Sequence, residues 1–519
     1  MARIRLLTAH ALPGAIVEER FTVDQAMHRK ADLLLLGGLI AAAAALRFSL
    51  LGARSFWFDE AFSVTVARLP LGQIVRYVAQ TDPHPPLYYL LLHGWLRLAD
   101  SPEMARALSM IFGILTILAT WGLARTVGGR GLAAVAGVLA AVAALGIQAS
   151  VEARMYPLLS LLVVTSTLLL WKATEESLRR WPWPAYVVTM AAALYVHYFA
   201  FLLVPAHLVF VLLYRRHSVR SMLVAVGAAL LAFGPWWPVV FDQVRAGNAS
   251  PVWKGVMPPT APLNIVALSS FGGYLLGLGG YLVDHRRWAP SQLLLVLPFL
   301  ALAATGAVAM GRRGAGTLMT AAWGIPLLAL VAASLATGIF YAIPRYASFV
   351  QPFFLLLLAQ GILTVSARGR RVVPVLVLTA VIVLNLTVLG LTLADPAYQP
   401  YDWAGASRHV RAHWQPGDGL IFYPGPARVA FGYYFPVSGA PAATLSPPSW
   451  DARLTRAQLV RGIPSFPALV KDAGRFWFIL TEPLPVEVGK ALMEAADRSY
   501  VRRQVLDFRY VYVLLYEHR

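Results

Sequence analysis

The stretch that decides the fold is ADLLLLGGLIAAAAALRFSLL, residues 31–51, which is followed closely by RSFWFDEAFSV, residues 54–64. The first part is an apolar run of the roughly 20 residues that a helix needs to cross the hydrocarbon of a membrane. The second part places two adjacent acids, Asp59 and Glu60, among aromatic side chains shortly after that run ends. Ionisable side chains near a membrane are costly, so the acidic pair marks a candidate functional site at the point where the chain leaves the bilayer.

The composition of the whole chain is that of a membrane protein. Of its 519 residues, 58% are hydrophobic and 13% are charged, and the mean hydropathy is +0.62. The net charge of +19 is spread in short clusters between apolar runs, which argues against a nucleic-acid partner. The chain has no cysteine, so a disulfide framework and a catalytic thiolate are excluded. The first apolar run lacks a small-residue cleavage site, so we expect no cleavable signal peptide.

Eleven apolar segments predict about 11 transmembrane helices. They lie at about 31–51, 104–125, 131–150, 155–172, 183–200, 201–214, 222–240, 290–310, 316–337, 347–365 and 372–394. Basic clusters fall at alternate connections, so the positive-inside rule makes these connections cytoplasmic and places the N-terminus inside. The clusters are Arg29–Lys30, Arg125 with Arg130, Arg179–Arg180, Arg215–Arg216, Arg312–Arg313 and Arg368–Arg371. We interpret residues 260–285 as an interfacial or re-entrant segment on the outer face, because a further span there would put the later basic clusters outside.

The composition changes near residue 395, where Asp, Gly, Pro and Arg become frequent. DGLIFYP, RFWFILT and YVYVLLYEH predict buried strands, and 402–414 and 486–497 predict amphipathic helices. The fold expected is therefore a polytopic α-helical membrane protein with a C-terminal extracytoplasmic α/β domain. Its two domains are residues 1–394, with a long first outer loop at 52–103, and residues 395–519. The protein is expected in the cytoplasmic membrane, in contact with membrane lipids.

Polar and aromatic residues gather at the predicted outer ends of the spans. Besides the acidic pair, the segments are TDPHPPLYYLLLHGW (81–95), SVEARMYPL (150–158), LYVHYFAF (194–201), SPVWKG (250–255) and FYAIPRYASF (340–349). Acids can deprotonate a hydroxyl nucleophile, and Arg and Lys can hold a phosphate leaving group. A phosphate at a membrane surface indicates a lipid phosphate, so the sequence predicts group transfer from a lipid-linked donor.

The order of these motifs resembles the GT-C integral-membrane glycosyltransferases. An acidic pair after the first span, followed about 20 residues later by Asp-Pro-His-Pro-Pro-Leu-Tyr-Tyr, is most similar to the branch of the protein O-mannosyltransferases and bacterial aminoarabinose transferases. EARMYPL, PRY and a tail that opens with YDWAGASRHVRAH fit the same pattern, over essentially the whole chain. The resemblance implies an inverting transfer of a single sugar from a polyprenyl-phosphate donor to an acceptor hydroxyl or phosphate at the outer face.

The resemblance also implies roles for individual residues. Asp59 would be the catalytic base, and Glu60 would orient the acceptor or shift the pKa of Asp59. Arg154 and Arg345 match positions suited to the donor phosphate. The remaining candidates are Lys254, Tyr156 and Tyr346 for the donor phosphate, and Asp82, His84 and His197 for positioning the acceptor and the first loop.

Other interpretations of these residues stay open. The acidic pair could only cap a helix, DPHPP could only be a rigid turn, and Arg154 could extend to lipid headgroups. The acids and imidazoles could hold a divalent metal ion, although the closer branch of the family favours a reaction without a cofactor. A glycan ligase, a lipid-linked sugar transporter or flippase, and a non-catalytic scaffold are the competing functions. The sequence does not specify the sugar, nor whether the acceptor is a lipid, a glycan or a protein.

Overall fold

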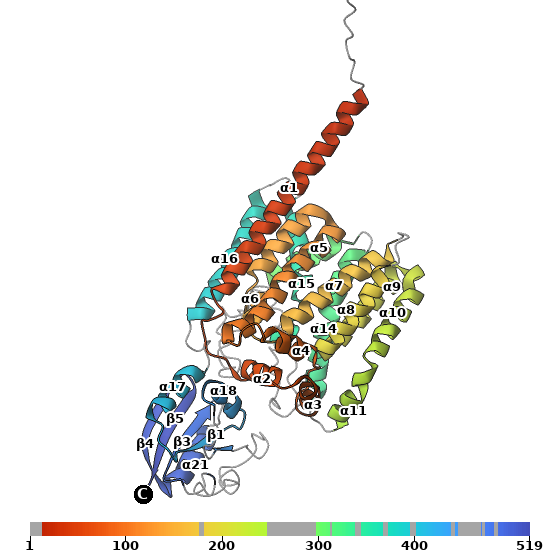
Figure 1. Ribbon diagram of the computed structural model, residues 1–519. Coiled ribbons are helices and arrows are strands. Elements are labelled where there is room, and N and C mark those ends of the chain that lie inside the picture. The colour runs from red at the N-terminus through yellow and green to blue at the C-terminus, as the bar shows by residue number, and fades with distance from the viewer. Residues whose placement is uncertain are drawn as a thin grey trace, which may run out of the picture.

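The computed structural model describes residues 13–175, 181–245, 297–311, 314–337, 344–366, 372–394, 401–436, 442–444, 469, 473–481 and 486–519. Within these ranges a bundle of apolar helices stands above a smaller unit that contains a β-sheet (Figure 1). The helices of the bundle are α1 (Pro13–Phe48), α5 (Pro102–Val142), α6 (Ala144–Ser150), α7 (Tyr156–Thr174), α8 (Pro182–Val196), α9 (Leu203–Tyr214), α10 (Val219–Ala232), α11 (Trp237–Arg245), α13 (Leu297–Ala309), α14 (Ala315–Thr337), α15 (Gln351–Ser366) and α16 (Val372–Ala394).

The bundle is that of a polytopic membrane protein. Five of the described helices are long and apolar enough to cross a membrane, and a pair bent by 48° makes a sixth if it is one span. The five are Lys30–Phe48, Pro102–Val142, Tyr156–Thr174, Ala315–Thr337 and Arg345–Val365, and the bent pair is Arg216–Ala232 with Gly234–Arg245. Shorter apolar helices lie at Pro182–Val196, Tyr198–Tyr214, Leu297–Ala309 and Pro374–Thr387. Each predicted apolar segment overlaps one or more of the described helices, while the count of eleven spans stays a prediction.

The longest helix, α5, is two antiparallel helices joined at Gly129. Gly129 has φ 84° and ψ −165°, a backbone conformation that glycine adopts readily and other residues avoid. A Cβ added at Gly137 would lie 2.7 Å from the ring of Trp121, although 16 residues of straight helix would separate these positions by about 24 Å. The chain therefore turns back at Gly129, between the predicted segments 104–125 and 131–150.

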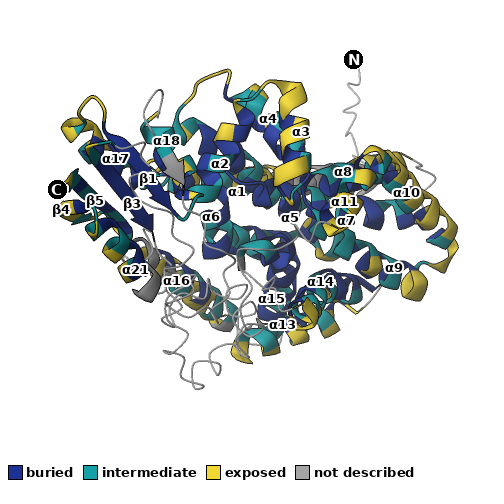
Figure 2. Cartoon of the chain, turned by 90° about the horizontal axis from the view of Figure 1, so that it is seen from below, coloured by how far each residue is buried: buried dark blue, intermediate teal, exposed yellow. Residues whose placement is uncertain are grey.

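The predicted first outer loop, residues 52–103, contains a layer of three short helices across one end of the bundle (Figure 1). These helices are α2 (Phe58–Ala67), α3 (Leu71–Thr81) and α4 (Leu87–Trp95). Most residues of α2 and α4 are buried or half-buried, whereas α3 exposes most of its length (Figure 2). The loop is therefore built to hold side chains in place rather than only to connect two spans.

The C-terminal unit contains a five-stranded mixed sheet of order β2-β1-β3-β5-β4. The strands are β1 (Gly419–Tyr423), β2 (Ala442–Thr444), β3 (Arg475–Thr481), β4 (Tyr500–Asp507) and β5 (Val511–His518). β1 runs parallel to β2 and β3, and β5 runs antiparallel to β3 and β4. The three predicted strands are confirmed as β1, β3 and β5, and the two predicted helices as α17 (Trp403–His413) and α21 (Val486–Asp497).

Alternation of side chains along β1 and β3 gives this sheet two buried faces. Leu420, Phe422 and Ile479 belong to the core that includes α17 and α18 (Ala427–Tyr434). Ile421 and Phe478 belong to a second cluster, shared with α21. Because successive residues of a strand point to opposite faces, a continuous apolar run is what a sheet covered on both sides requires. α18 lies between the sheet and α2 and so joins this unit to the first outer loop (Figure 1).

Candidate functional site

The two acids of the opening motif lie in the first turn of α2 and have different surroundings. Trp57 is the residue before the helix, and its backbone N–H donates to Glu60 Oε2 at 3.4 Å. Adjacent residues of a helix point about 100° apart, so the two carboxylates are directed toward different surroundings. The Asp59 side chain is 20% exposed, whereas that of Glu60 is fully buried.

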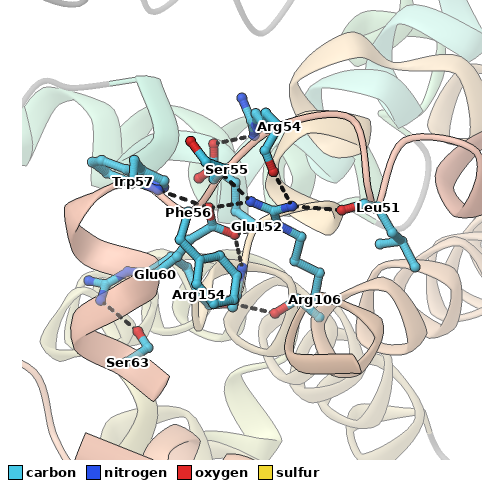
Figure 3. A network of polar contacts seen from close by, with 12 residues as sticks. Leu51, Arg54, Ser55, Phe56, Trp57, Glu60, Ser63, Arg106, Glu152 and Arg154 are labelled. Atoms are coloured by element: carbon cyan, nitrogen blue, oxygen red, sulfur yellow. Dashed lines mark hydrogen bonds and ion pairs between the residues drawn. The ribbon is translucent and has the colours of Figure 1, made fainter. Parts of the chain in front are cut away.

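Glu60 is held by a buried arginine. Arg106 of α5 donates from Nε to Glu60 Oε1 at 2.7 Å and from Nη2 to Oε2 at 2.8 Å, and the backbone N–H of Ala153 donates to Oε1 at 3.0 Å (Figure 3). Burial alone would raise the pKa of Glu60, but Arg106 outweighs it and the pKa is lowered. Glu60 is therefore an ionised link between α2, α5 and the segment before α7.

Arg106 also fixes the chain that leads into α2. It donates from Nη1 to Leu51 O at 2.6 Å and to Arg54 O at 2.9 Å, and from Nη2 to Ser55 O at 3.2 Å. With the two bonds to Glu60, all five guanidinium N–H groups have acceptors. The sequence reasoning missed this residue. The available signal was an arginine inside the apolar segment 104–125, since charges within spans are costly and so tend to have specific partners.

The carboxylate of Asp59 faces the two arginines that the sequence singled out. Arg154, between α6 and α7, places Nη2 3.9 Å from Asp59 Oδ2, and Arg345, in the 3-10 helix η8 (Pro344–Val350), places Nη1 3.5 Å from the same oxygen. Arg154 Nη1 also donates to Asp59 O at 3.2 Å and to Ser63 Oγ at 3.1 Å. Burial lowers the pKa of Arg154, but Asp59 and nearby groups outweigh it, so the pKa lies well above its usual value.

Aromatic side chains surround these cations. The Arg345 guanidinium lies 4.4 Å from the centre of the Trp57 ring and 5.5 Å from that of Tyr346. The rings of Tyr156 and Tyr346 are 5.9 Å apart, and that of His197 is 6.1 Å from Tyr156. Residues from four separate predicted outer segments are thus brought to one place.

Asp82 and His84 continue the same cluster. Asp82 Oδ1 accepts from the His84 backbone N–H at 3.0 Å and lies 2.5 Å from His84 Nδ1, and Asp82 Oδ2 accepts from the Tyr89 hydroxyl. Burial raises the pKa of Asp82, but His84, Arg154 and Tyr89 outweigh it and lower the pKa to about 2. An ionised carboxylate can only accept, so Nδ1 carries the proton and the other ring nitrogen of His84 is left for another partner. The His84 ring lies 4.9 Å from that of His197.

Gln243 of α11 fixes this motif from another side and was also missed. Its Nε2 donates to Asp82 O at 2.9 Å, and its Oε1 accepts from the Tyr198 hydroxyl at 2.9 Å. Trp236 Nε1 donates to the same hydroxyl at 3.0 Å. The DPHPP turn is therefore held by hydrogen bonds as well as by its prolines.

Several buried polar atoms in this cluster lack a hydrogen-bond partner within the described part of the chain. They are Trp57 Nε1, Arg154 Nε, Tyr156 Oη and His197 Nε2. Buried polar groups in proteins are nearly always hydrogen-bonded, so such a concentration marks a candidate ligand site. The arrangement offers positive charge and hydrogen-bond donors for an anion, with a carboxylate beside them.

Some predicted features fall on residues outside the described ranges. Outside the described residues lie Arg179–Arg180, Lys254, residues 260–285, Arg312–Arg313 and Arg368–Arg371. Among the residues that are described, no three or more His, Asp or Glu side chains are grouped so as to hold a metal ion.

Comparison with known proteins gives a family match and similar folds. Residues 83–241 match the family model described as dolichyl-phosphate-mannose-protein mannosyltransferase. The crystal structure of ArnT from Cupriavidus metallidurans in the apo state is similar with a TM-score of 0.56 at 15% identity, over 92% of this chain and 97% of that one. The same protein bound to undecaprenyl phosphate gives a TM-score of 0.53 at 15% identity, with the same coverage of 92% and 97%. The archaeal oligosaccharyltransferase AglB from Archaeoglobus fulgidus, at 12% identity over 93% of this chain and 74% of that one, has a TM-score of 0.49. No curated protein matches the chain.

Fold and family match point to one class that this chain resembles, the polytopic membrane glycosyltransferases of the GT-C type. More particularly, residues 83–241, from the DPHPP turn to α11, match the model of the dolichyl-phosphate-mannose-protein mannosyltransferase family. The resemblance inferred from the sequence motifs is confirmed.

Proposed function

We propose that the protein is an inverting glycosyltransferase that moves a single sugar from a polyprenyl-phosphate donor to an acceptor hydroxyl or phosphate. The observation that carries the proposal is the approach of Arg154 and Arg345 to Asp59 from two distant parts of the chain. The undecaprenyl phosphate bound to ArnT, a protein of similar fold, supports a lipid phosphate as the anion.

The two arginines suit a phosphate leaving group. Their distances to Asp59 Oδ2, 3.9 and 3.5 Å, exceed the roughly 2.8 Å of a tight charge-assisted hydrogen bond. A phosphate can therefore compete with Asp59 for both guanidinium groups. Charge that develops on the phosphate oxygen as the glycosidic bond breaks would be stabilised by groups already in place.

Asp59 is then the residue that takes the proton. The acceptor oxygen attacks the anomeric carbon, the bond from that carbon to the phosphate oxygen breaks, and the acceptor proton passes to the Asp59 carboxylate. Attack opposite the leaving group inverts the anomeric centre.

The other predicted residues take supporting roles in this proposal. Glu60, which the sequence suggested as catalytic, has both carboxylate oxygens bound to Arg106, so we assign it a positioning role. Tyr156 Oη and His197 Nε2 are available to contact the phosphate or the sugar. Asp82 with His84 and Tyr346 shape the same site, and Lys254 stays a prediction.

The same proposal includes an orientation in the membrane. Asp32 of α1 forms ion pairs with Arg130 at 2.8 Å and with Arg125 at 3.9 Å. These residues lie by the turn of α5, at the end of the bundle away from α2 and the sheet (Figure 1). Positive charge at this end supports a cytoplasmic N-terminus, with the first loop and an extracytoplasmic domain at 395–519 on the outer face.

Binding of polyprenyl phosphate tests the phosphate site directly. We expect Arg345→Gln to weaken binding by about tenfold or more, because a hydrogen bond to a charged group contributes about 1.5–3 kcal/mol. Arg503→Gln is the control, since Arg503 forms an exposed ion pair with Glu517 in the sheet. Equal affinities for the wild type and Arg345→Gln would overturn the assignment.

A further inference from the structure

The backbone just before Asp59 is bound by the C-terminal unit. The backbone N–H of Phe56 donates to the hydroxyl of Tyr434, at the end of α18, at 2.7 Å. One residue earlier, Ser55 Oγ donates to Tyr401 O at 2.6 Å. Two successive residues of the first loop are therefore tied to a part of the chain more than 300 residues away.

Apolar contacts reinforce this attachment. The Phe56 ring is fully buried and meets the ring of Tyr433 edge-on at 4.8 Å. The guanidinium of Arg68, directly after α2, lies 4.8 Å from the centre of the same Tyr433 ring. Both ends of α2 thus contact α18.

Tyr401 is itself fixed to the sheet. Its backbone N–H donates to Arg509 O at 2.9 Å, and the N–H of Asp402 donates to Phe508 O at 3.1 Å. Both acceptors lie in the turn between β4 and β5. Ser55 is therefore hydrogen-bonded to a residue that is itself bound to the turn between β4 and β5.

The same short segment is held from the opposite side by the membrane domain. Arg106 donates to the carbonyl groups of Leu51, Arg54 and Ser55, so the C-terminal unit binds the N–H of Phe56 while α5 binds the carbonyls before it. Residues 54–57 are the entry to α2, and Asp59 is in the first turn of that helix. The direction of the Asp59 carboxylate depends on how this entry is held.

We infer that Tyr434 is a positioning residue for Asp59, and that the C-terminal unit thereby completes the catalytic site. The inference rests on the proposed role of Asp59 in transfer. The N–H of Phe56 precedes the helix and has no place in its hydrogen bonding, so without the Tyr434 hydroxyl it loses the acceptor that the structure gives it. Backbone N–H groups in buried segments need an acceptor, and the entry to α2 would shift to find one.

Tyr434→Phe removes only this hydroxyl and keeps the ring. We expect kcat to fall about tenfold while the KM for the donor changes less than about twofold, because the phosphate-binding arginines are untouched. Tyr500→Phe is the matched control, since the Tyr500 hydroxyl donates to Ala473 O at 3.2 Å in the same unit, far from α2. Ser55→Ala removes the second link, and we expect it to lower kcat in the same direction.

Hydrogen exchange supplies a readout that does not depend on turnover. We expect the peptide containing Phe56 to exchange faster in Tyr434→Phe than in the wild type and in Tyr500→Phe, in the full-length protein. Unchanged exchange at this peptide would overturn the inference, whether or not the wild type transfers a sugar. Absence of sugar transfer by the wild type would count against the proposed function instead. Faster exchange with unchanged kcat in an active enzyme also overturns it.

Discussion

Arg106 and Glu60 form a fully buried ion pair in which both carboxylate oxygens accept hydrogen bonds from one guanidinium group, at 2.7 and 2.8 Å. Arg106 comes from a membrane helix and Glu60 from the first outer loop. The pair therefore joins the membrane domain to the helix that carries Asp59. The pair also gives the two neighbouring acids different partners, since Glu60 is bound by Arg106 while Asp59 faces the candidate phosphate site.

Removing the charge of Glu60 should destabilise the protein strongly. Breaking a buried ion pair by changing one partner costs about 3–5 kcal/mol, because the other charge is left without compensation. We expect Glu60→Gln to lower the thermal unfolding temperature in detergent far more than Glu152→Gln does. Glu152 pairs with Arg54 at 3.1 Å with both side chains partly exposed, so its loss should cost less than that of the fully buried pair. Equal effects of the two substitutions would show that the buried pair is not the main link.

The two buried tyrosines Tyr156 and Tyr186 should respond in opposite ways to loss of the hydroxyl. Tyr156 Oη has no partner among the described residues, so Tyr156→Phe should leave stability unchanged and lower transfer about tenfold through a lost ligand contact. The Tyr186 hydroxyl lies 3.0 Å from His207 Nδ1 inside the bundle. Tyr186→Phe should therefore cost about 1 kcal/mol of stability and leave transfer nearly unchanged. Loss of stability without loss of activity in Tyr156→Phe would contradict the ligand contact.

Acid should remove the stabilisation that Asp82 provides. Its pKa is lowered from 3.8 to about 2 in the folded protein, so the folded state binds fewer protons than the unfolded state between these values. The stabilisation is fully present above about pH 4 and is lost as the pH falls toward 2, and it amounts to about 2 kcal/mol. We expect the unfolding temperatures of the wild type and Asp82→Asn to differ at pH 6 and to converge as the pH is lowered through this window. A difference that is constant with pH would mean that the Asp82 charge is not what stabilises the turn.

The absence of cysteine allows the orientation to be tested with single substitutions. Leu98 and Val505 are 68% and 53% exposed, and the orientation proposed puts both on the outer face. We expect a membrane-impermeant thiol reagent to label Leu98→Cys and Val505→Cys in intact cells. His217→Cys, exposed in the basic connection after α9, should react only after the membrane is opened. The reverse pattern of labelling would contradict the orientation.

Much of the fold follows from local sequence. Apolar length predicts the membrane helices, and the continuous runs of β1 and β3 predict a sheet covered on both faces. The break at Gly129 coincides with the polar gap between two apolar segments. β4 was missed because YVRRQVLD is an edge strand whose outward residues are mostly polar and exposed.

The residues of the candidate site likewise include some that the sequence indicates and some that it does not. Asp59, Arg154, Arg345 and Tyr156 stand out because polar residues at the ends of spans are costly and therefore informative. Tyr434 gives no such signal, since its partner Phe56 lies 378 residues away and the bond uses a backbone N–H. The split between Asp59 and Glu60 depends on Arg106, and only the folded chain brings that side chain to one acid and not to the other.

Transfer from a polyprenyl-phosphate sugar by purified wild-type protein and by Asp59→Asn is the measurement that tests the central claim most directly. With an acceptor present, we expect the wild type to release polyprenyl phosphate, and Asp59→Asn to lose this release while it still binds polyprenyl phosphate. Turnover by Asp59→Asn at the wild-type rate would contradict the account.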